Sequence, residues 1–187
     1  MTGHAERLAL PPEDERSPEQ KRAAEGIVAG PRGELLGPFV PLLHSPELTN
    51  RLQLVGEHLR FGSAIDDDLF ELAVLTVARH WNQPFEWAMH RPLAEAAAVP
   101  GGVLDEVSHD RRPSSGRPEL ATVWDAVREL LTVGDLRDET YRALEPLGSE
   151  VIVELVTAVG YYTTLALVMN VAGTVPPSGA PRLPPPD

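Results

Sequence analysis

The 187-residue chain is long enough to bury a sizeable core in one domain, and 42% hydrophobic with 24% charged residues is an ordinary globular composition. The formal net charge of −12 repels phosphate backbones, so nucleic acid is not an expected partner. Cysteine is absent, which excludes disulfides, thiolate nucleophiles and cysteine-ligated zinc. The first twenty residues lack an apolar core of signal-peptide length, so we expect a soluble cytoplasmic protein.

Composition along the chain predicts one helical domain with a tail at each end. Residues 1–17 are polar and proline-containing, and we expect them to be flexible. Residues 174–187 are proline-rich and cannot be helical. The domain is therefore expected over residues 18–173.

Two helices in the first third of the chain share a start signal of serine followed by proline. The first is predicted over residues 18–29, with Ser17 as the N-cap. The second is predicted from residue 46 until Gly62 ends it. Apolar residues at helical spacing predict the buried face of this second helix: Leu48, Leu52, Val55 and Leu59.

The middle of the chain predicts two further helices and a loop. One helix covers residues 66–81, and the next covers 82–98 with Pro84 near its start. Pro92 predicts a kink or a helix boundary within the second of these. Residues 101–118 are predicted to form a loop.

The last third predicts three helices, over about 119–133, 138–147 and 149–172, which makes an all-α domain of six to eight helices. No charged residue occurs from Leu155 to Gly173, a run that nearly reaches the ~20 residues needed to cross a bilayer. The run contains threonine, tyrosine, glycine and asparagine, and no basic cluster flanks it. We therefore expect a buried central helix and no membrane partner.

Three residues form a candidate acid–base group. Glu86 and His90 are four residues apart on one predicted helix, so they share a face. A carboxylate beside an imidazole orients the ring and raises its pKa, which suits acid–base catalysis. Glu71 belongs to the preceding helix, and antiparallel packing would place it far from Glu86 unless the helices cross steeply.

Structural roles and a metal site are alternatives for the same residues. Glu71 follows Asp68 at capping-box spacing, and Glu86 lies in a first helical turn, where the helix dipole favours an acid. The glutamates and histidines are also competent metal ligands. Their spacing is neither HExxH nor Glu-x-x-His, so we expect no bound metal.

Seven further residues are candidates for substrate binding. The fork of Arg79 matches a carboxylate, although the same side chain suits a surface or interface ion pair. Polar groups within an apolar helix need partners or line a pocket. The candidate set is Arg79, His80, Trp81, Trp87, Tyr161, Tyr162 and Asn170.

The stretch ELAVLTVARHWNQPFEWAMH, residues 71–90, resembles the carboxymuconolactone decarboxylase family, whose fold is shared with the alkylhydroperoxidase AhpD. The segments GPFVPLLHSPELTNRLQLVGEHLRFG and VELVTAVGYYTTLALVMN resemble the same family, so the resemblance covers residues 35–172. It implies an AhpD-like orthogonal helical bundle that assembles into homo-oligomers, either trimers or hexamers. It also implies that Glu71 and His90 lie at one pocket.

The resemblance is to the branch of this family that lacks cysteine. The peroxidase branch places a C-x-x-C ahead of the histidine, and Gln83 and Glu86 occupy those positions here, so thiol-dependent peroxide reduction is excluded. We expect a lyase that uses no cofactor and acts on a small carboxylated lactone or oxo-acid. His90 would donate the proton, held by Glu86, with Glu71 as a second acid–base or orienting group. The alternative is a non-catalytic oligomeric binding or accessory protein.

Overall fold

The computed structural model describes residues 7–185, and over these residues it contains nine α-helices, two short 3₁₀ helices and no strand. The prediction of an all-α helical bundle is therefore confirmed, and the nine α-helices of the described residues exceed the predicted number of six to eight. The described residues form two compact units, one of residues 7–63 and 167–175 and the other of residues 64–166 and 176–185. Of the two predicted tails, residues 1–6 and 186–187 lie outside the described residues.

The first unit contains three helices before residue 63, and α3 packs against the other two. Their bounds are α1 (Pro18–Ala29), α2 (Phe39–Leu42) and α3 (Pro46–Phe61). The predicted start of α1 is confirmed, because the Ser17 hydroxyl accepts from Gln20 N and the Gln20 side chain accepts from Ser17 N. Ala23, Ala24 and Leu43 form a small buried cluster in this unit.

The predicted buried face of α3 is confirmed at Leu59 and wrong at Leu48 and Val55, which are 50% and 42% exposed. Thr49 and Gly56 are buried in their place. The Thr49 hydroxyl donates to Leu42 O at 2.6 Å, which satisfies this polar group inside the unit. The apolar pattern did not predict this position, because threonine is not counted as an apolar residue.

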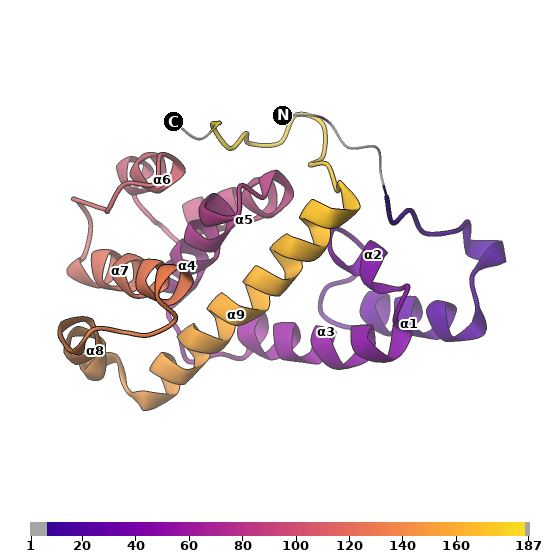
Figure 1. The fold of residues 1–187 in the computed structure, drawn as a ribbon, viewed down its shortest axis with the longest axis horizontal. Helices are drawn as coiled ribbons and strands as arrows, with labels where there is room; N and C mark the ends of the chain where they lie inside the picture. Colours follow the sequence, from indigo (N-terminus) through magenta and orange to yellow (C-terminus); the bar gives the residue numbers. More distant parts are fainter. Residues whose placement is uncertain (1–6, 186–187) are drawn as a thin grey trace. The chain divides into compact units, whose positions relative to one another are not determined.

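The second unit is built around α4, which packs against α5, α6 and α7 (Figure 1). The helices of this unit are α4 (Asp67–His80), α5 (Pro84–Ala96), α6 (Gly101–Ser108), α7 (Pro118–Thr132), α8 (Asp138–Leu144) and the first part of α9 (Ser149–Ala172). Every residue of α4 from Leu69 to Arg79 is buried. A helix that is covered on all sides can present polar side chains only to the interior.

Two predictions about the middle of the chain are corrected. Helix α6 occupies the first part of the predicted loop 101–118, because three apolar residues at helical spacing are buried there: Val103, Leu104 and Val107. The sequence did not predict this helix because it begins with Gly101 and Gly102, and glycine disfavours helices. Helix α5 also continues through Pro92 without a boundary.

The connection between α4 and α5 is a Schellman motif. Gln83 N donates to Ala78 O at 2.8 Å and Asn82 N donates to Arg79 O at 3.2 Å. Asn82 has a φ of 48°, a left-handed conformation that asparagine tolerates better than most residues. The Gln83 side chain then accepts from Phe85 N and begins α5. This compact reversal returns the chain along α4.

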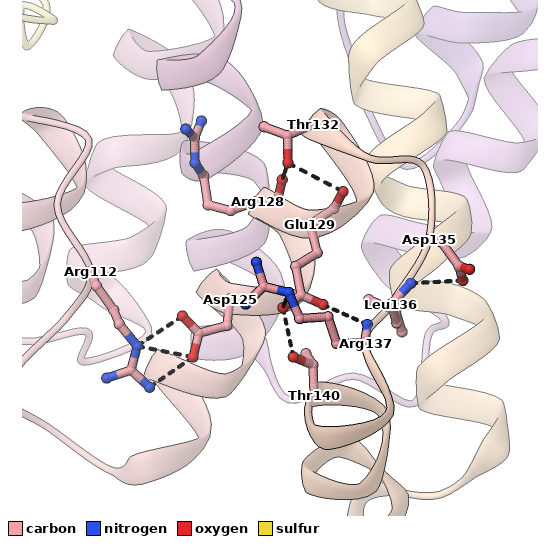
Figure 2. A network of polar contacts seen from close by, with 9 residues as sticks. All are labelled: Arg112, Asp125, Arg128, Glu129, Thr132, Asp135, Leu136, Arg137 and Thr140. Carbon is pink, nitrogen blue, oxygen red and sulfur yellow. Dashed lines mark hydrogen bonds and ion pairs between the residues drawn. The ribbon is translucent and has the colours of Figure 1, made fainter.

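A buried carboxylate connects α7 to α8, and Figure 2 shows it. Glu129 accepts from Arg137 N at 2.9 Å and from the Thr140 hydroxyl at 2.8 Å. These contacts satisfy backbone and side-chain donors at the first turn of α8. The bidentate pair of Arg112 and Asp125 in the same figure is a separate, more exposed contact.

Helix α9 is long and apolar enough to cross a membrane by length and composition, and half of its most apolar window is buried. A core helix in a soluble protein passes the same test. In the second unit, α9 contributes Glu154, whose carboxylate accepts from Ala64 N at 2.7 Å.

Candidate functional site

The structure holds His90 between two carboxylates. Its Nδ1 lies 2.7 Å from Glu71 Oε2 and its Nε2 lies 3.4 Å from Glu86 Oε1. All three side chains are buried. Carboxylates accept only, so the Nδ1–H of His90 donates to Glu71, and this is the tighter of the two contacts.

The α4–α5 reversal explains why Glu71 meets His90. Glu71 lies in the second turn of α4 and His90 in the second turn of α5, at similar distances in sequence from the connection at Asn82. Antiparallel packing therefore places them side by side. Glu71 does not form a capping box, because its carboxylate faces His90 and the Asp68 carboxylate accepts from Leu69 N instead.

The electrostatics of the cluster favour a protonated imidazole. Burial by itself lowers the pKa of His90, but the charge of Glu71 and the hydrogen bonds that His90 donates to Glu71 and Glu86 outweigh burial and raise the pKa to about 9. Near neutral pH, His90 is therefore an imidazolium that can donate a proton.

Two tyrosines of α9 lie beside the cluster. The Tyr162 ring makes an edge-on contact with His90, with ring centroids 5.2 Å apart, and a similar contact with Phe70 at 5.9 Å. Tyr161 packs edge-on against Tyr162 at 5.3 Å. One wall of the His90 cluster is therefore aromatic.

Trp87 is fully buried on α5, three residues before His90 and on the same helical face. Its indole N–H has no acceptor among the described residues. A buried donor of this kind normally has a partner.

Arg79, Trp81 and Asn170 are three further candidate residues. Arg79 follows Glu71 by eight residues on α4, which is about 12 Å along the helix axis. Trp81 donates its indole N–H to the Thr163 hydroxyl at 3.1 Å. Asn170 is exposed and belongs to the first unit. Arg79 therefore does not join the Glu71–His90–Glu86 cluster, and its side chain bonds to Ser108, Pro184 and Asn82 instead.

Arg79 and His80 instead line a separate cavity of about 420 Å³, here termed the arginine pocket. Its lining residues are Arg79, His80, Asn82, His109, Asp110, Arg128 and Pro185. The contributions of Asp110 and Arg128 were missed from the sequence, because they are 18 residues apart and no local spacing connects them.

Within the described part of the chain, no group of three or more histidine or acidic side chains is arranged to hold a metal ion. Comparison of the sequence with models of known protein families gives no match, and comparison with curated proteins gives none either.

Proposed function

We propose that this protein is a cofactor-independent lyase, similar to carboxymuconolactone decarboxylase, that acts on a small carboxylated lactone or oxo-acid. The observation that carries the proposal is the buried imidazole of His90 between Glu71 and Glu86. A titratable group with a strongly perturbed pKa is typical of proton-transfer sites. The resemblance of residues 71–90 to the cysteine-free branch of that family supports the same reaction class.

Decarboxylation fits a buried proton donor. The bond between the carboxylate and its carbon breaks, CO₂ leaves, and the electron pair stays on the substrate as a carbanion or dienolate. His90 donates a proton to that carbon and recovers it from solvent, so one proton is consumed for each CO₂ released. Its Nε2–H is the better placed donor, because the contact with Glu86 is longer than the contact with Glu71.

The neighbouring residues would orient the His90 ring and stabilise the charge that develops on the substrate. Glu71 fixes the ring through Nδ1 and is a positioning residue. Trp87 offers an unused buried N–H to the oxygen on which charge develops. Tyr161 and Tyr162 exclude water on one side, which strengthens each of these interactions.

The direct test is decarboxylation of γ-carboxymuconolactone, followed by loss of ultraviolet absorbance and by CO₂ release. We compare the wild type with His90→Gln, which keeps a polar side chain but cannot donate a proton of comparable acidity. We expect turnover in the wild type and a loss of at least about 100-fold in the variant, the usual contribution of a general acid.

Trp87→Phe provides a second variant, because it removes a donor that has no acceptor among the described residues. We expect lower turnover, with a loss of stability of about 1–2 kcal/mol because the buried ring is smaller. Full activity in folded His90→Gln would contradict the assigned role.

A second candidate follows from the mutual pairing of the cluster, in which the acids and the imidazole satisfy one another between α4 and α5. On this alternative the chain is a non-catalytic binding or accessory protein. Unfolding of His90→Gln together with no turnover in the wild type would favour it.

For either candidate we infer a homo-oligomer, a trimer or a hexamer. The acidic chain exposes apolar side chains on α9, among them Val153 at 64% and Val156 at 42% exposure, which suit contacts between copies. Light scattering coupled to size-exclusion chromatography measures the mass directly. A monomer at micromolar concentration would contradict this inference.

A further inference from the structure

The arginine pocket differs in chemistry from the His90 cluster. Its lining includes two arginines, two histidines and one aspartate. With neutral histidines the formal charge of these side chains is positive, although the whole chain carries −12. Its volume of about 420 Å³ falls within the range of small-molecule sites. A polar, positively charged cavity of this size suits a small anion.

Arg79 is held rigidly at this cavity. It is only 5% exposed, and its Nη1 donates to Ser108 O at 3.2 Å and to Pro184 O at 2.8 Å. Its Nη2 donates to Asn82 Oδ1. Arginine has five N–H bonds, so two have no acceptor among the described residues. Because the side chain is already ordered, a ligand would lose little entropy in recruiting them.

Arg128 and His80 add donors whose direction is fixed. Arg128 Nη1 lies 3.0 Å from His80 Nδ1, and since a guanidinium cannot accept, Nδ1 accepts and the imidazole is neutral with its proton on Nε2. Burial and the charge of Arg128 both lower the pKa of His80, against an opposing effect of Asp110. The Nε2–H of His80 therefore remains a donor near neutral pH.

Asp110 is the one acidic side chain among the lining residues. Its Oδ2 lies 3.2 Å from Arg128 Nη2, and its side chain is 42% exposed. A carboxylate at this place occupies a donor of Arg128 and repels an incoming anion. Asp110 therefore competes with an anionic ligand for the guanidinium of Arg128.

We propose that the arginine pocket binds the carboxylate or phosphate group of a small organic anion through Arg79, Arg128 and the Nε2–H of His80. Guanidinium groups match the oxygens of both anions. The pocket lies about 12 Å along α4 from Glu71, and its lining includes none of Glu71, Glu86 and His90. Failure of the proposed lyase activity and failure of anion binding are therefore separate results.

The test is titration of the full chain with inorganic phosphate and, separately, with succinate, which distinguishes the two sources of the oxyanion. Isothermal calorimetry measures binding. Tryptophan fluorescence offers a second signal, because the rings of Trp81 and Trp124 contact His80 and Arg128 respectively. We expect saturable binding of at least one probe, with an affinity that falls as salt is added.

Three substitutions make the test specific. Arg128→Gln should weaken binding about tenfold or more, since it removes a charged hydrogen-bond donor. Arg112→Gln changes the net charge equally but lies outside the pocket lining, and should leave affinity within about twofold. Asp110→Asn should strengthen binding. Asparagine tolerates the φ of 55° at position 110, so this variant should fold. It therefore tests anion binding even if Arg128→Gln fails to fold.

The proposal is supported by saturable binding that is tightest in Asp110→Asn, nearly equal in wild type and Arg112→Gln, and weakest in Arg128→Gln. Absence of saturable binding of both probes at concentrations up to about ten millimolar overturns it. Equal weakening by Arg112→Gln and Arg128→Gln also overturns it, because that result would show a response to overall charge. An unchanged affinity in Asp110→Asn would also overturn the proposal, because Asp110 would then not compete with the anion.

Discussion

The stability of this protein should fall as pH rises from about 6 to 10, and His90 should be the cause. The folded-state pKa of His90 is raised from 6.5 to about 9 by Glu71 and Glu86, against burial. Folding therefore favours the protonated form. That stability is fully present below the unfolded pKa of 6.5 and is lost as pH rises through about 9.

The shift sets the magnitude. A difference of 6.5 against about 9, at 1.36 kcal/mol for each pKa unit, corresponds to about 3 kcal/mol. The unfolding free energy is measured by urea denaturation at several pH values between 6 and 10, at constant ionic strength. The same series on His90→Gln removes this contribution while leaving every other titrating group in place.

The quantity of interest is the difference between wild type and His90→Gln at each pH. We expect it to decrease by about 3 kcal/mol from pH 6 to pH 10. A difference that stays constant within about 0.5 kcal/mol, or one that increases with pH, refutes the reasoning. Carbon-detected NMR of the imidazole gives an independent check. Its titration midpoint should be near 9 and should drop in Glu71→Gln, where burial is less opposed.

Two further predictions concern stability. Glu129→Ala should cost about 1–3 kcal/mol, because it removes the acceptor of the buried Thr140 hydroxyl and of the part-buried Arg137 N–H. Arg112→Ala at the more exposed pair should cost less than about 1 kcal/mol. Thermal or urea unfolding measures both costs, and equal costs would contradict the account. Ala98→Gly should stabilise the fold by about 0.5–1 kcal/mol, because Ala98 has a φ of 64°, a conformation that favours glycine over alanine. Ala97→Gly is the control, since Ala97 has a φ of −76° and should gain no stability from glycine. The same unfolding measurements compare the two variants.

Much of the secondary structure could be predicted from the sequence, because helix ends depend on neighbours in the chain. The predicted span of α1, its cap at Ser17 and the long span of α9 agree with the structure. Helix α6 was missed because its signal is short and begins with two glycines. The absence of cysteine, and with it of thiol chemistry, also needed no structure.

Tertiary structure decided which side chains meet. Local spacing paired His90 with Glu86, but the closer partner is Glu71, 19 residues away, which the α4–α5 reversal returns to the same place. Arg128 approaches His80 across 48 residues, and no periodicity in either helix indicates that contact. Helix formation is governed by hydrogen bonds over four residues, whereas a buried cluster depends on how helices pack. The sequence by itself therefore determined the helices and excluded thiol chemistry, and packing determined the acid–base cluster and the arginine pocket.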